Sequence, residues 1–318
     1  MIPKYTIMNY YPYIRGKQYE LISLRGLNEF VTNKGVICPI IEPVKIGSTL
    51  SRTISTLQES GHSFILLLNP EYGDYRDKTI IECWDKLFEI LDGRMQDIHF
   101  GFLAHVKLNE ITHVIEEKGL TNVSVVINDN AELTPLLSQL VQQNPFQEIV
   151  MADNRSTRRL MHGIDTNKIV ISDRFNSKNR NVEYLIIEDE FFSDDHKFYY
   201  EDGYSGFSDY VTIGDNYTES GFLPYAVAIH WTYLDQDDNF RVRHLVSDSN
   251  EDNTDIPGKF GEALQHLIEF ADVNNLPNTY ALREMRRYRD FGDYPGLGVL
   301  KKLSILNHFE LVHNYFTK

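Results

Sequence analysis

The sequence has little cysteine, fewer cationic than anionic side chains, and no long apolar run. Only two of its 318 residues are cysteines, Cys38 and Cys83, and both stand in apolar surroundings without metal-ligand spacing. We therefore expect two buried thiols in a reducing compartment and no structural disulfide. No apolar stretch is long enough to span a bilayer, and residues 1–4 are not followed by the apolar region of a signal peptide. These absences predict a cytoplasmic protein.

The charge balance narrows the choice of partners. The chain carries 46 Asp and Glu against 31 Lys and Arg, a formal net charge of -15. Because phosphate backbones attract cations, this balance argues against direct, non-specific binding of nucleic acid. The anionic side chains concentrate in 188–209 and 235–255, whereas 283–290 (REMRRYRD) is locally basic.

Short apolar runs alternate with segments of helical period through the first half of the chain. The opening run ends at Arg15, and the segment after it places Leu21, Leu24 and Leu27 at helical spacing. The runs are continuously apolar rather than alternating, which is typical of parallel strands buried on both faces by helices. Six further runs follow, at 36–45, 63–75, 99–107, 122–130, 148–154 and 168–175.

Seven such strand–helix units predict an α/β fold, a (β/α)8 TIM-barrel-like architecture. We place the eighth strand at 206–215 and the closing helix at 258–275. The alternative is an open doubly wound sheet with a separate C-terminal α+β part. A barrel requires the first and last strands to pair, whereas an open sheet forbids this pairing.

The predicted barrel covers residues 1–277 and contains two insertions. One is an acidic, aromatic loop at 188–205, and the other is a β-hairpin at 224–248, where apolar and polar residues alternate around a turn-rich centre. A helical extension is expected at 278–318.

Polar side chains end almost every predicted strand. In a barrel of this type the carboxyl ends of the strands meet at one mouth, where active sites lie. Carboxylates and a histidine there can supply a general acid and a general base, and cations can neutralise a phosphate group. The candidate catalytic residues are Glu42, His105 and Asp209, and the candidate ligands of an anion are Arg15, Lys17, Lys45, Asn69 and Ser208.

A divalent metal ion is an alternative use of the same mouth. Asp129, Asp153 and Asp173 follow three of the strands, and their oxygen atoms suit an ion that activates water for phosphodiester cleavage. No known metal signature has this spacing. The same residue types also cap helices and form structural ion pairs, so both interpretations stay open.

The short motif Arg15-Gly16-Lys17 also has two interpretations. It stands before a helix N-terminus, where backbone N–H groups and the helix dipole favour an anion. The other interpretation is a solvated turn in which Arg15 or Lys17 pairs with Glu20 or Glu42. In the basic segment 283–290, Arg286 and Arg287 could dock a partner subunit or pair with the protein's own acidic residues.

Three stretches resemble the bacterial and phage "beta protein" family. They are Y-P-Y-I-R-G-K-x-x-E-L near the N-terminus, PIIEPVK, and GFSDYVTIGDNYTESGFLPYAVAIHWTY. The likeness is to the defence-island branch, which is encoded beside a restriction-endonuclease-like protein. It implies a barrel-like α/β fold and a role in antiviral defence, and it supplies no catalytic residues. The positions that match are Tyr13, Arg15, Lys17, Glu20, Glu42, Lys45, Gly206, Ser208 and Asp209.

Three functions are therefore open. The first is a subunit of a prokaryotic antiphage system that binds a phosphorylated ligand or a phage component and acts with a partner nuclease. The second is a metal-dependent phosphodiesterase or nuclease with its site at the barrel mouth. The third is a non-catalytic scaffold subunit.

Overall fold

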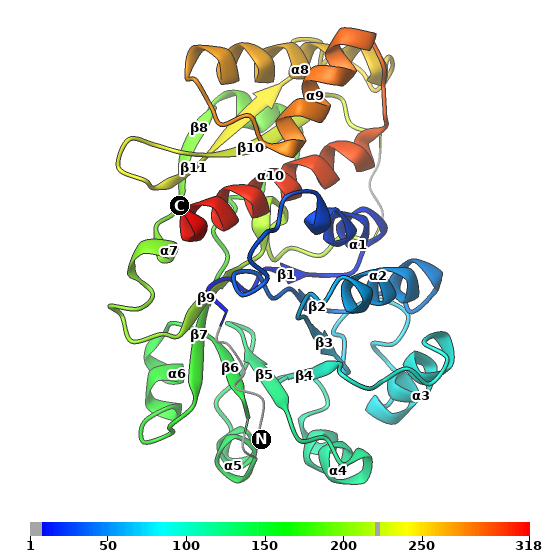
Figure 1. Ribbon diagram of the computed structural model, residues 1–318, viewed down its shortest axis with the longest axis vertical. Coiled ribbons are helices and arrows are strands. Elements are labelled where there is room, and N and C mark those ends of the chain that lie inside the picture. The colour runs from blue at the N-terminus through cyan, green and yellow to red at the C-terminus, as the bar shows by residue number, and fades with distance from the viewer. Residues whose placement is uncertain (1–7, 145, 220–222) are drawn as a thin grey trace. The chain divides into compact units, whose positions relative to one another are not determined.

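The computed structural model describes residues 8–144, 146–219 and 223–318 (Figure 1). By their contacts these residues divide into two compact units. The first contains the described residues up to Leu21, with Lys34–Ser172 and Asp195–Asp209. The second contains Ile22–Asn33, Asp173–Asp194 and Tyr210–Lys318.

The first unit contains the eight strands of the predicted barrel, whereas the closing helix expected at 258–275 lies in the second unit. These eight strands form one parallel sheet in the order β1-β2-β3-β4-β5-β6-β7-β9. The strands are almost completely buried, which explains their continuously apolar sequences. Their bounds are β1 Tyr13–Ile14, β2 Ile40–Ile41, β3 Ile65–Leu67, β4 His99–Leu103, β5 Val123–Ile127, β6 Glu148–Ala152, β7 Asn167–Ser172 and β9 Gly206–Asp209.

The chain just before β1 closes the sheet. Tyr10 forms parallel bridges to Ile37 on one side and to Phe207 of β9 on the other. The N–H of Tyr11 donates to the carbonyl of Phe207 at 2.8 Å, and the N–H of Phe207 donates to the carbonyl of Asn9 at 3.0 Å. The segment that leads into β1 therefore pairs with the last strand, which confirms the barrel and excludes the open sheet.

Helices follow the strands around the barrel, and local sequence fixes where several of them begin. Thr79 caps α3 in a capping box with Glu82, and Thr134 caps α5 ahead of a proline at its first position. The helices are α1 Gln18–Arg25, whose first half belongs to this unit, α2 Ser48–Glu59, α3 Ile80–Ile90, α4 Leu108–Lys118, α5 Pro135–Gln143, α6 Arg155–Leu160 and α7 Asp195–Phe198.

The second unit is built on a three-stranded antiparallel sheet in the order β10-β11-β8. The predicted hairpin is confirmed as β10 (Ala228–Leu234) and β11 (Phe240–Val246). Trp231 of β10, 1% exposed, lies in one apolar core with side chains of α8, α9 and α10. These helices span Ile256–Val273, Tyr280–Phe291 and Leu297–Thr317, and three short 3-10 helices span Gly26–Glu29, Asn181–Leu185 and Val211–Ile213.

The prediction of an acidic loop at 188–205 is wrong for the first half of this segment, which forms strand β8 (Asp189–Ser193). Its carboxylates pair with cations of β11: Arg241 contacts Asp189, and Arg243 contacts Glu188 at 2.9 Å. Opposite charges on neighbouring strands stabilise a sheet. The acidic side chains of this strand are neutralised by arginines from a distant part of the chain. Considered alone, its sequence therefore resembles that of a loop.

The boundary expected at residue 277 falls inside the second unit. Asn307 of α10 donates to the carbonyl of Thr232 in β10 at 2.8 Å and accepts from Thr279 at 2.9 Å. The C-terminal helices thus share a core with the hairpin. No helix within the described residues is both long enough and apolar enough to cross a membrane.

Candidate functional site

Four consecutive strands bring charged side chains to one mouth of the barrel. Arg15 follows β1, Glu42 follows β2, Glu71 comes after β3, and His105 comes after β4. Because these strands are parallel neighbours, their carboxyl ends lie on the same side of the barrel. This is the end at which (β/α)8 enzymes carry their active sites.

Glu42 is the central acceptor of this group and is 1% exposed. The hydroxyl of Tyr13 donates to its Oε2 at 2.8 Å, and the backbone N–H of Glu71 donates to its Oε1 at 2.8 Å. Nε of Arg15 lies 3.6 Å from Oε2. Burial raises the pKa of Glu42, while the charge of Arg15 and the hydrogen bonds act in the opposite direction.

Glu71 joins Glu42 to His105. Its backbone contacts Glu42, and its side-chain Oε2 lies 3.1 Å from Nε2 of His105. The interaction with His105 lowers the pKa of Glu71, so this group is a carboxylate at neutral pH. Both ring nitrogens of His105 are buried: among the described residues Nδ1 has no hydrogen-bond partner, and Nε2 has only the 3.1 Å approach to Glu71, which is not a well-aligned hydrogen bond. A neutral imidazole beside a carboxylate, with its other nitrogen unused, can act as a general base.

Asn69 forms hydrogen bonds with the backbone of the turn that carries His105. Its Nδ2 donates to the carbonyls of Leu103 at 2.8 Å and Val106 at 2.6 Å, and its Oδ1 accepts from the N–H of Leu103 at 2.7 Å. Both amide donor hydrogens are used within the protein. The geometry makes Asn69 a positioning residue for His105 rather than the anion ligand that we expected.

In the Arg15-Gly16-Lys17 motif, Arg15 pairs with Glu42, as the second interpretation predicted. Arg15 is 6% exposed, lies beside Glu42, and has its guanidinium carbon 5.4 Å from the centre of the Tyr72 ring. The pair is buried, so it differs from the solvated turn considered above. The side chain of Lys17 is half-buried, and that of Lys45 is exposed.

Ser208 and Asp209 of β9 are engaged with the segment that closes the barrel. The hydroxyl of Ser208 donates to the carbonyl of Tyr11 at 2.5 Å, and Oδ1 of Asp209 accepts from the hydroxyl of Tyr10 at 2.7 Å. Both are at most 2% exposed. Their described contacts hold β9 against the N-terminal segment.

The three aspartates considered as metal ligands do not form a group. Asp129 is exposed and accepts from Asn154, while Asp173, in the second unit, accepts from the N–H groups of Phe175 and Asp215. Within the described residues, no three His, Cys, Asp or Glu side chains are placed to hold a metal ion. The metal site expected from these aspartates is therefore not formed.

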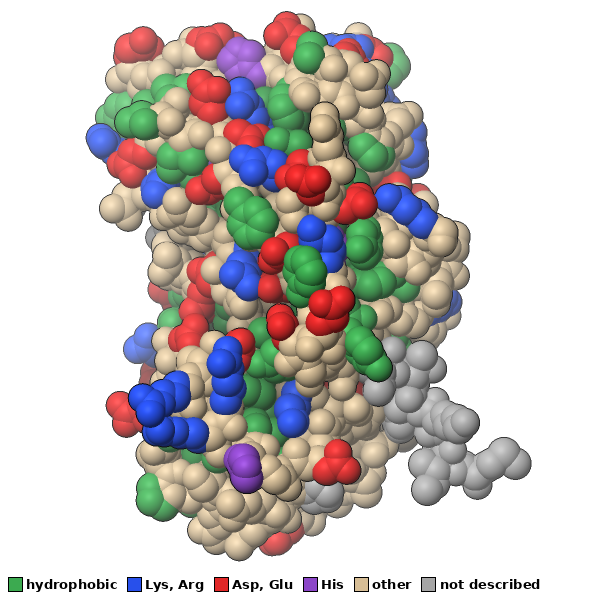
Figure 2. Space-filling view, turned by 90° about the vertical axis from the view of Figure 1, so that its left-hand side faces the viewer, with side chains coloured by type: hydrophobic (Ala, Val, Ile, Leu, Met, Phe, Trp, Pro, Cys, Tyr) green, Lys and Arg blue, Asp and Glu red, His purple; other side chains and the backbone are tan. Residues whose placement is uncertain are grey.

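Asp153 has structural partners of its own. It makes a two-point contact with Arg158 of α6 at 2.5 and 2.6 Å and accepts from the hydroxyl of Tyr204 at 2.7 Å. Figure 2 shows the side of the molecule on which α6 lies in Figure 1, and Lys and Arg side chains gather in its lower part. Asp153 neutralises part of the charge of this basic helix.

Our candidate set omitted Glu71 and Asn128, although each follows an apolar run. Asn128 comes after β5 as His105 comes after β4, and it is 6% exposed. Its Oδ1 is buried without a hydrogen-bond partner in the described part of the chain. The sequence shows both as polar residues after apolar runs. Polar residues near the carboxyl ends of strands are too common, however, for this pattern to single out these two.

A second polar group lies at the amino ends of the barrel strands and was also missed. The hydroxyl of Ser124 in β5 donates to Oε2 of Glu148 at 2.6 Å and lies 2.8 Å from Nε2 of His99. His99 opens β4 and Glu148 opens β6. Burial raises the pKa of Glu148 to about 7 and lowers that of His99 to about 4, so the imidazole is neutral at pH 7.

Glu148 should make the stability of the protein depend on pH. Its pKa in the folded state, about 7, exceeds that of an exposed Glu, so between pH 4.5 and 7 the folded protein binds more protons than the unfolded one. The free energy of unfolding contributed by this group therefore falls as the pH rises through that window. When the pH is raised from 5 to 7.5, we expect the free energy of unfolding of Glu148→Gln to rise by about 2 kcal/mol relative to that of the wild type. Urea unfolding at both pH values measures this, and parallel curves for the two proteins would contradict it.

Comparison with known proteins adds little to this geometry. No model of a known protein family and no curated protein matches the sequence. Among solved structures, a mutant of FabK from Thermotoga maritima is similar, with 11% identity and a TM-score of 0.35 over 98% of this chain and 96% of that one. The barrel is established by the order and closure of its own strands.

Proposed function

We propose that the carboxyl-end mouth of the barrel binds a small anionic ligand and that His105 exchanges a proton with it. The observation that carries the proposal is the His105–Glu71 pair, whose second imidazole nitrogen is buried and has no hydrogen-bond partner among the described residues. With a carboxylate beside the imidazole, this nitrogen is suited to accept a proton from a bound molecule.

Arg15 supports the anionic character of the ligand. Its guanidinium keeps its charge at all physiological pH values, and its buried position strengthens electrostatic attraction. Burial raises the pKa of Glu42, so its carboxylate is easier to protonate when an anion takes the place beside Arg15. A phosphorylated small molecule fits this chemistry, because phosphate oxygens match the planar fork of an arginine.

Thermal unfolding in the presence of inorganic phosphate and a panel of nucleotides tests the proposal. A ligand of the folded state raises the melting midpoint with the logarithm of its concentration. Arg15→Lys keeps a positive charge beside Glu42 but loses the fork, and we expect it to weaken binding at least tenfold. His105→Gln should retain binding and lose the proton exchange with the bound molecule.

Lys45→Gln is the matched control, since it removes an exposed cation near the same mouth. A flat screen with the wild-type protein would contradict the proposal. An equal loss of affinity in the Lys45 and Arg15 variants would contradict the specific role of Arg15.

We further propose that the protein acts in antiphage defence with a restriction-endonuclease-like partner. The support is the resemblance of three sequence stretches to the "beta protein" family, and α9 is the surface that we would test first. There Arg286 contacts Asp272 at 2.6 Å, and Arg287 contacts Glu284 at 2.8 Å. These internal pairs use part of the basic charge.

Charge reversal on α9 tests the partner surface. Arg286→Glu combined with Arg287→Glu should abolish co-purification of the nuclease while leaving the melting midpoint close to that of wild type. Arg180→Glu reverses another exposed arginine, one outside α9, and serves as the control. Unchanged co-purification of the α9 variant would remove this surface from consideration.

A further inference from the structure

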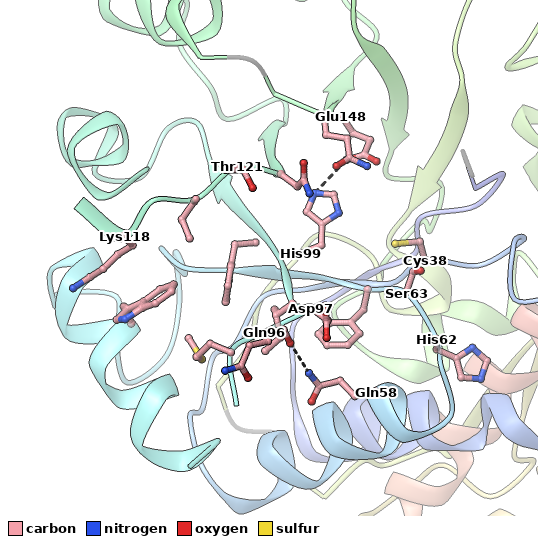
Figure 3. Close-up of a pocket in the computed structure, with 18 of the residues that line it drawn as sticks. Cys38, Gln58, His62, Ser63, Gln96, Asp97, His99, Lys118, Thr121 and Glu148 are labelled. Atoms are coloured by element: carbon pink, nitrogen blue, oxygen red, sulfur yellow. Dashed lines mark hydrogen bonds and ion pairs between the residues drawn. The ribbon is translucent and has the colours of Figure 1, made fainter. Parts of the chain in front are cut away.

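A cavity of about 840 Å³ opens at the amino ends of the barrel strands, opposite the mouth described above (Figure 3). Most of its lining comes from the segments at the amino ends of β3, β4, β5 and β6, and α3 contributes Trp84 and Phe88; all of these residues lie within the first unit. The volume is within the range of pockets that bind small molecules. His99 and Glu148 form part of its wall, and in Figure 3 the imidazole points toward the carboxyl group.

Two neighbouring polar groups of the buried wall are hydrogen-bond acceptors. Oε1 of Gln147 is buried without a hydrogen-bond partner among the described residues, and Gln147 lines the cavity. The carboxyl group of Glu148, next in the chain, accepts from Ser124 and from the Gln147 side chain, and only 9% of the Glu148 side chain is exposed. An unsatisfied buried acceptor is costly, and a ligand that donates to it removes that cost.

The charges of the wall favour a cation over an anion. Lys118 is the single Lys or Arg among the described residues that line the cavity; its ammonium group contacts Glu117 at 2.9 Å and lies 5.9 Å from the centre of the Trp84 ring. Glu148 has no such cation beside it in the lining. A positively charged ligand would supply the missing countercharge, whereas a negatively charged one would be repelled.

The other walls are aromatic. Trp84 and Phe100 pack with ring centres 5.2 Å apart, and Phe88 is 52% exposed beside them in the lining. Flat apolar groups gain from contact with such rings, and exposed aromatic side chains in a concave site are typical of ligand pockets.

We propose that this cavity binds a small molecule that carries a protonated nitrogen group on a flat apolar body. The nitrogen donates to Glu148 and Gln147, and the body lies against Trp84 and Phe88. Because a cation stabilises the carboxylate, binding lowers the pKa of Glu148 and releases protons near pH 7.

Benzamidine, benzamide and benzoate have nearly the same shape but different charges. Comparing them separates the contribution of the charge to binding from that of the aromatic ring. We expect benzamidine to raise the melting midpoint and to change the fluorescence of Trp84, benzamide to bind at least tenfold more weakly, and benzoate to have no effect. Calorimetry in two buffers of different ionisation enthalpy should show proton release with benzamidine. A Trp231→Phe background makes Trp84 the reporter.

Two variants locate the site. Glu148→Gln should weaken benzamidine at least tenfold and abolish proton release, while Asp97→Asn, which removes an exposed carboxylate from the rim, should change affinity less than twofold. Ser63→Trp, at an exposed lining position, should block the cavity without touching Glu148. Equal affinity for benzamidine and benzoate, equal effects of Glu148→Gln and Asp97→Asn, or no binding at millimolar probe would each overturn the proposal. None of these outcomes depends on Arg15 or His105, so failure here leaves the proposed function of the other mouth intact.

Discussion

Replacing Glu42 by alanine should lower the free energy of unfolding of the barrel by about 3–5 kcal/mol. The substitution removes the carboxylate beside the buried guanidinium of Arg15 and the acceptor for the hydroxyl of Tyr13 and the N–H of Glu71. A buried charge that loses its partner keeps its desolvation cost without the compensating attraction. Urea unfolding followed by the fluorescence of Trp84, in a Trp231→Phe background, reports on this unit.

Two further variants separate charge from hydrogen bonding at this position. Glu42→Gln keeps an acceptor and should cost clearly less than Glu42→Ala. Adding Arg15→Met to Glu42→Gln should recover stability, since it removes the buried guanidinium that the neutral amide cannot compensate. Glu89→Ala, which removes an exposed ion pair with Lys86, should leave the midpoint unchanged. A loss for Glu42→Ala no larger than that for Glu89→Ala would show that the pair is not a structural element.

The architecture followed from the sequence because parallel strands covered on both faces leave a continuous apolar trace. The eighth strand is the instructive exception. It is only four residues long, Gly206–Asp209, and the chain enters a 3-10 helix at Val211, so the expected span of 206–215 was too long. It pairs with β7 on one side, but closure of the barrel depends on its pairing with residues almost 200 positions earlier, which the local pattern does not contain.

The sequence predicted where the site lies but not which side chains contact one another. Glu42 and His105 were expected at the mouth because they follow strands, and both lie there. The link between them passes through Glu71, whose backbone and side chain face different partners. That geometry depends on the turn after β3. The group at the opposite end was missed because His99 and Glu148 begin strands, where barrel residues usually serve stability.

Gly73 is the residue that makes the turn after β3 possible, and Gly73→Ala should cost about 3 kcal/mol or more. Its φ of +85° is unfavourable for a side chain, and an added Cβ would lie 1.9 Å from the carbonyl oxygen of Val44. The N–H of Asp74 donates to that same oxygen at 3.0 Å. The backbone must therefore move, and Glu71 moves with it.

Gly163→Ala separates the two causes, because Gly163 has a φ of +80° but no atom within 4 Å of an added Cβ. We expect it to cost only about 1 kcal/mol, the strain of a left-handed alanine. The excess in Gly73→Ala then measures the close approach to Val44. Since that approach holds Glu71 between Glu42 and His105, Gly73→Ala should also weaken any phosphate-dependent shift of the melting midpoint, whereas Gly163→Ala should not. Equal destabilisation by the two substitutions would mean that the turn can relax away from Val44, and the geometry of the His105–Glu71 pair would then not depend on it.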